Sequence, residues 1–280
     1  MVKVNIKGKE VSIDGYLLKK LESIKYIITK NWDCVILIDG KERSGKSTLG
    51  LTIGAYLDPN FSITNVATGA EAAAMKIGTL PRHSVLLIDE GSLVFNSKDS
   101  MRAEQKRLVK IMDVVGQKNM VFIIVLPSFF DLNKLIAVRR SKFLLHVYTD
   151  KKLNRGRFTY FGEKKKSYLY IIGKKNFGSY SKPRADFYGR FVDFNPLGKE
   201  YLRAKDKSLR EALQEKDVKS FKMIELKFKK DLVLKLEENM KEEEQKKRIA
   251  ISGLPAGTYR RILSNLMLEP SRKATLLYNT

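Results

Sequence analysis

Residues 34–51 read CVILIDGKERSGKSTLGL, an apolar run followed by a glycine-rich loop and a helix-forming segment. The run CVILI has the length and composition of a buried parallel strand, and STLGLTIGAYL, which begins at Ser47, favours a helix. Glycines let the intervening backbone turn tightly and bring several N–H groups toward one anion. The stretch therefore predicts a phosphate-binding turn between a strand and a helix, and with it an α/β fold.

The loop fits the pattern G-x-x-x-x-G-K-[ST], known as Walker A. Lys46 is expected to reach the β- and γ-phosphates of ATP, and Ser47 to offer its hydroxyl to Mg²⁺. The helix that begins near Gly45 points its positive dipole end at the same place. An ordinary glycine-rich turn is the alternative, but it would not explain the flanking strand and helix. The residues expected to bind the nucleotide are Gly40, Lys41, Glu42, Arg43, Ser44, Gly45, Lys46, Ser47, Thr48 and Asp89.

A second motif, SVLLIDEGS at residues 84–92, is an apolar strand that ends in two carboxylates. A strand ending in Asp next to a P-loop places that carboxylate beside Mg²⁺, so Asp89 is expected to hold the metal through water. Glu90 follows, where it can polarise an attacking water. The alternative is a helix cap or a solvated strand end.

Composition narrows the possible partners. Lys and Arg number 54 against 31 acidic residues, a net charge of +23. This excess favours a polyanionic partner, nucleic acid or an anionic membrane face, and the alternative is a soluble protein with a lysine-rich surface. The single cysteine, Cys34, permits no intramolecular disulfide. The longest apolar run, MVFIIVLPSFF, is short and interrupted by Pro127, so no membrane insertion is expected. The expected location is the cytoplasm, or the host cytoplasm if the protein is viral.

Strand and helix patterns alternate from residue 31 to residue 150, which predicts an α/β fold: a P-loop core with a parallel sheet flanked by helices. Three regions are expected: an N-terminal hairpin and helix (1–30), an ATPase domain (31–198) and charged helices (199–280). Residues 156–178 suggest a basic β-hairpin whose aromatic side chains could stack on bases, or an ordinary exposed hairpin.

Residues 242–267 have the rhythm of a helix-turn-helix, with a turn through Gly253 and Pro255. The segment resembles the helix-turn-helix modules of recombinases and transcription factors, which implies contacts with double-stranded DNA from the start of the second helix. The alternative is a plain helical hairpin. The expected contact residues are Thr258, Tyr259, Arg260 and Arg261.

The order of motifs resembles the additional-strand P-loop ATPases that use a catalytic Glu. Within them, it is similar to the HerA–FtsK group, the viral genome-packaging ATPases and the zonula occludens toxin-like ATPases. The resemblance implies that Ser128 senses the γ-phosphate, where the group usually has Gln or Asn. It also implies that Arg139 or Arg140 is an arginine finger offered to the neighbouring subunit of a homo-oligomeric ring.

Together these features predict an ATP-hydrolysing DNA translocase or packaging-type motor that uses Lys46, Ser47, Asp89 and Glu90. A helicase loader, replication initiator or segregation ATPase would use the same core without sustained movement. A small-molecule or nucleotide kinase would use the same loop with an arginine-rich lid, for which RRSK (139–142) could be mistaken. A non-catalytic switch is disfavoured by the presence of Glu90.

Overall fold

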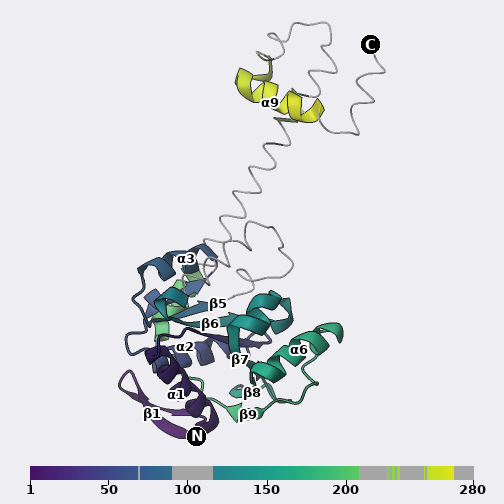
Figure 1. The fold of residues 1–280 in the computed structure, drawn as a ribbon. Coiled ribbons are helices and arrows are strands. Elements are labelled where there is room, and N and C mark those ends of the chain that lie inside the picture. Colours follow the sequence, from purple (N-terminus) through teal and green to yellow (C-terminus); the bar gives the residue numbers. More distant parts are fainter. Residues whose placement is uncertain are drawn as a thin grey trace. The chain divides into compact units, whose positions relative to one another are not determined.

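The computed structural model describes residues 1–68, 70–89, 116–207 and 251–267, and singly residues 226, 229, 230, 232, 233 and 249. Two compact units make up the chain, residues 1–205 and residues 206–280. The first unit contains the strands and most of the described helices (Figure 1). No helix among the described residues is long and apolar enough to cross a membrane.

A seven-stranded sheet forms the centre of the first unit. Its spatial order is β4 (Val66–Thr68), β5 (Val85–Asp89), β6 (Val121–Leu126), β3 (Cys34–Gly40), β7 (Ser141–Tyr148), β8 (Arg157–Phe161) and β9 (Phe187–Arg190). The first five strands run parallel to one another. At one edge of the sheet, β8 pairs antiparallel with β7, and β9 pairs antiparallel with β8. All seven residues of β3 are buried, as the continuous apolar run CVILI predicts for a central parallel strand.

Helices cover both faces of this sheet. The described helical elements of the unit are α1 (Gly15–Thr29), α2 (Lys46–Leu57), η1 (Ile63–Asn65), α3 (Ala70–Thr79), η2 (Phe129–Asp131), the π-helix η3 (Leu135–Arg140), α6 (Glu163–Lys175) and a helix over residues 198–207. Alternate residues of β3 face two separate cores: Ile36 and Ile38 pack with α1 and α2, and Val35 and Leu37 pack with α3 and α6. The predicted α/β sheet with helices on both faces is confirmed.

The N-terminal segment belongs to the same hydrophobic core as the sheet. β1 (Val2–Ile6) and β2 (Lys9–Ile13) form the predicted hairpin, and the Asp14 side chain caps α1 by accepting from the backbone N–H of Tyr16. Ile6 and Leu21 are buried in the cluster that contains β3. Residues 1–30 therefore contribute side chains to the hydrophobic core of the first unit. The sequence of residues 97–119 also favours a helix; most of this range lies outside the described residues, and residues 116–118 are helical.

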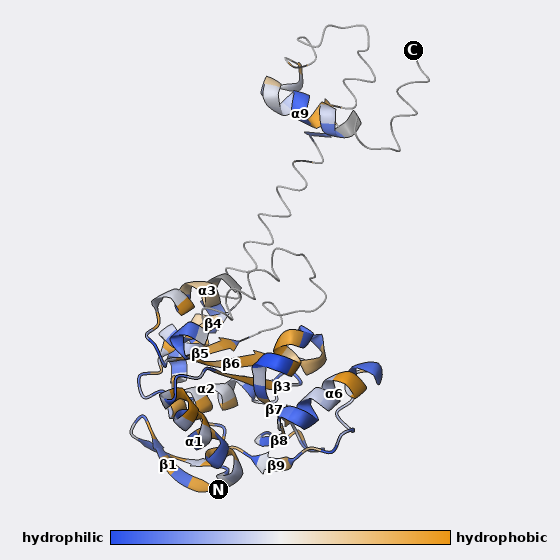
Figure 2. Cartoon of the chain, viewed as in Figure 1, coloured by the Kyte–Doolittle hydropathy of each residue, from blue (hydrophilic) through white to orange (hydrophobic). Residues whose placement is uncertain are grey.

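The prediction of a β-hairpin at residues 156–178 is wrong. β8 is followed by α6, and only β8 and the later strand β9 join the sheet. Figure 2 shows α6 with apolar and polar residues interleaved along its length. Its buried positions are Lys166, Leu169, Tyr170 and Gly173, a spacing of three and four residues that fits a helix face and no strand. The alternation of Tyr, Phe and Lys in the sequence conceals this period.

Lys166 fixes α6 to the π-helix. Its side chain is fully buried, and its Nζ donates to the carbonyl oxygens of Ala137 and Ser141, each at 2.7 Å, and to the Ser141 hydroxyl at 2.7 Å. The ammonium thus satisfies carbonyls that the end of the π-helix would otherwise leave buried without donors. Burial lowers the pKa of Lys166 to about 8.

Replacing Lys166 by Met should lower the free energy of unfolding by about 1–3 kcal/mol, because several buried carbonyls lose their donor. Chemical denaturation measures this, with Lys164→Met as the matched control, since Lys164 is exposed on the same helix. Because the folded-state pKa lies below the ordinary value of 10.5, the unfolded chain binds more protons between pH 8 and 10.5. The stability difference between wild type and Lys166→Met should therefore grow as the pH rises through that window. Equal stabilities of the two variants would contradict this role.

Candidate nucleotide-binding site

The loop between β3 and α2 folds back on itself as the glycine pattern predicts. Gly40 and Gly45 have φ values of 141° and 99°, and Arg43 between them has a φ of 59°. A Cβ at Gly40 would lie 2.0 Å from the carbonyl oxygen of Val147 on β7, so only glycine allows this close approach. Gly45 is the N-cap of α2 and supplies no side-chain cap. The first N–H groups of α2 are therefore directed at the position of a bound phosphate.

Lys46 carries the positive charge of the loop. Its Nζ donates to the carbonyl oxygen of Lys41 at 2.6 Å. Burial lowers the pKa of Lys46, while the nearby carboxylates of Asp39 and Asp89 oppose this effect. The ammonium thus lies between two strand-end carboxylates, where it can reach a phosphate that enters the loop.

Asp89 and Ser47 come together from sequence positions 42 residues apart. The Ser47 hydroxyl donates to Asp89 Oδ1 at 3.0 Å, and Asp89 is buried at the end of β5. A hydroxyl and a carboxylate are the oxygen donors that Mg²⁺ prefers, so this pair fits the ion that the sequence predicts. In the same loop, the buried Ser44 hydroxyl has no hydrogen-bond partner among the described residues, which supports a ligand site there. Glu90, the expected catalytic base, lies outside the described residues.

A cluster that sequence analysis missed surrounds Asp39, the residue before the loop. The Asp39 carboxylate is fully buried and accepts from the backbone N–H of Phe129 at 2.9 Å, from the Tyr180 hydroxyl and, at 3.0 Å, from His146 Nδ1. The rings of His146 and Tyr180 are stacked with centroids 3.7 Å apart. Burial, together with the Asp39 charge, raises the pKa of Tyr180 and keeps it a hydrogen-bond donor. An aspartate inside an apolar strand pattern was the available signal.

The strand order places the predicted sensor at the same edge of the sheet. β6 lies between β3, which leads into the phosphate loop, and β5, which ends in Asp89. β6 is thus the additional strand that the sequence resemblance implies. Ser128 follows its carboxyl end, half-buried, and its hydroxyl accepts from the backbone N–H of Phe130 at 3.3 Å. A role for Ser128 in sensing phosphate stays a prediction.

Arg139 and Arg140 lie at the opposite edge. Ser141, which follows them, pairs with Val35 at the start of β3, whereas Gly40 at the end of β3 pairs with Val147. A strand of this length spans roughly 20 Å, so neither arginine can reach the phosphate loop of its own subunit. The two differ in their surroundings: Arg140 donates to Asp33 at 2.8 Å, and Arg139 is exposed.

Two further side chains contact Asp89, and sequence analysis missed both. Asp89 Oδ2 accepts from the Tyr201 hydroxyl and from Lys205 Nζ, the latter at 3.2 Å. Both come from the helix over residues 198–207, in a region that the sequence suggested was a solvated, charged helix. Charged residues surround Tyr201 in the sequence, so no apolar periodicity indicates whether this tyrosine is buried or exposed.

The second unit contains α9 (Ala256–Met267), preceded by a helical residue pair and a turn at Gly253, where the helix-turn-helix pattern places them. One of the four expected DNA contacts is wrong: Tyr259 is fully buried against Val233 and Ile262, so its ring is not available to a base. Arg260 and Arg261 are exposed and Thr258 is half-buried.

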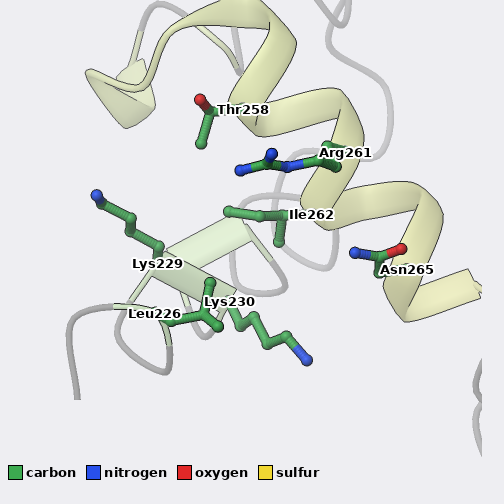
Figure 3. A pocket seen from close by; sticks show the side chains of 7 residues that line it. All are labelled: Leu226, Lys229, Lys230, Thr258, Arg261, Ile262 and Asn265. Atoms are coloured by element: carbon green, nitrogen blue, oxygen red, sulfur yellow. The ribbon is translucent and has the colours of Figure 1, made fainter. Parts of the chain in front are cut away.

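A basic pocket of about 380 Å³ lies beside α9 within this unit. Figure 3 shows side chains of α9 projecting toward a second segment that carries two lysines. Among the described residues the lining contains three cationic side chains and no carboxylate: Leu226, Lys229, Lys230, Thr258, Arg261, Ile262 and Asn265. Thr258, Arg261 and Asn265 follow a spacing of three and four residues and so share one helix face. Arg260 does not line the pocket, whereas Asn265, absent from the sequence prediction, does.

No family model matches the chain, and no curated protein matches it. Among solved structures, the DNA-packaging ATPase from Sulfolobus Turreted Icosahedral Virus is 15% identical with a TM-score of 0.34, covering 48% of this chain and 94% of that one. The N-terminal domain of zonular occludens toxin from Neisseria meningitidis is 13% identical with a TM-score of 0.40, covering 57% and 94%. A DNA polymerase III gamma subunit-related protein from Thermotoga maritima is 16% identical with a TM-score of 0.35, covering 47% of each chain. With TM-scores below 0.5, these likenesses do not by themselves define the activity of this chain.

Proposed function

We propose that this chain, a P-loop NTPase in its fold and phosphate loop, hydrolyses ATP and uses the energy to move or package double-stranded DNA. One observation carries the first half of the proposal: the loop backbone, the Lys46 ammonium and the Ser47–Asp89 pair meet at the carboxyl edge of the sheet. Few arrangements other than a nucleotide site bring an anion cradle, a cation and a metal-type oxygen pair to one place.

In this proposal each residue has a physical task. The loop N–H groups and Lys46 bind the β- and γ-phosphates, and Ser47 and Asp89 would hold Mg²⁺, which neutralises charge that develops on the phosphates. Glu90, next to Asp89 in the sequence, takes the proton of the attacking water. Ser128, at the same edge of the sheet, contacts the γ-phosphate.

The arginines support assembly into a ring. Because Arg139 and Arg140 lie at the far end of β3 from the phosphate loop, a finger role requires a neighbouring subunit's nucleotide. Arg139 is the better candidate, since Arg140 already pairs with Asp33.

The DNA half of the proposal rests on charge. The chain carries a net charge of +23, and the described residues that line the pocket on α9 include Lys229, Lys230 and Arg261. Arginine and asparagine on one helix face are side chains that contact guanine and adenine edges, and lysines beside them contact phosphates. A nucleic-acid duplex is therefore the polyanion that best suits this face.

The first test is ATP hydrolysis by the full chain with and without double-stranded DNA. We expect DNA to stimulate hydrolysis, and Glu90→Gln to lower the rate about a hundredfold or more while nucleotide binding persists, because the general base is lost. Phosphate release and binding of a fluorescent ATP analogue measure the two effects. A rate that DNA leaves unchanged would contradict coupling, and transfer of phosphate to a small molecule would indicate a kinase.

Subunit mixing tests the finger. Arg139→Ala alone should lower hydrolysis about a thousandfold. Mixing it with Glu90→Gln should restore part of the activity, because an Arg139→Ala site can then receive the arginine of a Glu90→Gln neighbour. Arg140→Ala should instead lower stability through loss of the Asp33 pair. Unchanged hydrolysis by Arg139→Ala, or no recovery on mixing, would remove Arg139 from this role.

Arg260 and Arg261 are adjacent on α9, but only Arg261 lines the pocket, so variants of the two residues can be compared directly. Arg261→Ala should weaken duplex binding about tenfold and reduce its salt dependence, whereas Arg260→Ala should change it less, because only Arg261 lines the pocket. Fluorescence anisotropy at several salt concentrations measures both. Equal losses in the two variants would mean that the charge acts without this geometry.

A further inference from the structure

Lys205 occupies a place that a magnesium-dependent nucleotide site does not require. Its ammonium lies 3.2 Å from Asp89 Oδ2, while the Ser47 hydroxyl donates to Asp89 Oδ1. Its charge also lowers the pKa of Lys46, so two ammonium groups share the neighbourhood of one strand-end carboxylate. The Lys205 ammonium and a divalent metal ion are both attracted to the negative charge of Asp89, so they would compete for this carboxylate.

The segment that supplies Lys205 is anchored at its beginning. The Phe191 ring lies against Gly45 in the phosphate loop, and the Thr52 hydroxyl of α2 donates to the Phe194 carbonyl at 2.8 Å. Farther along, Tyr201 is buried and bonds to the same Asp89 oxygen as Lys205. This segment therefore contacts the phosphate loop and α2 first, and its helix over residues 198–207 then contacts Asp89.

The side chains of Lys205 and Asp89 differ in their exposure to solvent. The Lys205 side chain is 43% exposed, whereas that of Asp89 is 2% exposed, so the Lys205 ammonium is within reach of solvent and the Asp89 carboxylate is not.

We propose that Lys205 is a positioning residue that competes with Mg²⁺ for Asp89. The ammonium neutralises Asp89 when the site holds no metal and leaves it when Mg²⁺ and nucleotide bind. This inference rests on the proposed nucleotide site and adds to it a residue that controls access of Mg²⁺ to Asp89.

The test compares Lys205→Met with wild type in nucleotide binding, not in hydrolysis. A fluorescent ATP analogue is titrated into the full chain in Mg²⁺ and, separately, in EDTA. Without its competitor the metal should bind Asp89 more readily, so the ratio of Kd in EDTA to Kd in Mg²⁺ should rise about fivefold or more, the range of one charge-assisted hydrogen bond. Arg203→Met is the matched control, because Arg203 is an exposed cation of the same helix.

Each alternative has its own result. An unchanged ratio in Lys205→Met, or weaker binding in Mg²⁺, would overturn the inference; the second result would make Lys205 a phosphate ligand. In these cases wild type still binds nucleotide, and the proposed function stands. If wild type bound no nucleotide in either condition, the proposed function would fail, and the inference with it.

Hydrogen exchange gives an independent measurement on wild type. Backbone amides of residues 198–207 should exchange faster with Mg²⁺ and a non-hydrolysable ATP analogue than in EDTA, because the contact between Lys205 and Asp89 is lost. The same amides in Lys205→Met should show little difference between the two conditions. Slower exchange on metal and nucleotide binding in wild type would contradict the proposed departure of Lys205.

Discussion

The buried carboxylate of Asp39 is the point on which the arrangement of the site depends. Asp39 is the last residue but one of the central strand β3, and its three donors come from three different parts of the chain: Phe129 after β6, His146 on β7, and Tyr180 in the segment between α6 and β9. A carboxylate with no access to water requires such donors, since an unpaired buried charge is strongly destabilising. Meeting that requirement aligns the carboxyl ends of β3, β6 and β7. The phosphate loop that begins at Gly40 is therefore built on a fixed edge.

The sequence predicted the elements whose pattern is local. The apolar run of β3, the glycine loop, the strand that ends in Asp89 and the N-terminal hairpin were all readable, because each depends on residues within a short window. The helix α6 was mistaken for a hairpin because its aromatic and lysine residues alternate, and only burial reveals its helical period. Tyr259 was mistaken for a surface residue for a related reason: a tyrosine in a basic helix can face either side.

The contacts that complete the site could not be predicted in the same way. Tyr201 reaches Asp89 across 112 residues, and Tyr180 reaches Asp39 across 141. Such pairs depend on the order of strands in the sheet, which a single sequence does not contain. The aspartates themselves gave a clue, since a carboxylate at the end of an apolar strand needs partners. Their identity came only with the fold, which also separated Arg140, paired with Asp33, from the exposed Arg139.

The placement of Arg139 at the amino end of the sheet, away from its own phosphate loop, also has a consequence for how the protein would behave in a cell. If hydrolysis needs an arginine from a second molecule, an isolated subunit is idle and consumes little ATP. Turnover then depends on encounters between subunits and rises more steeply than in proportion to their number. Gathering molecules on a common substrate would start the reaction, and dilution would stop it. Under that condition, the local concentration of subunits would control ATP hydrolysis without a separate inhibitor.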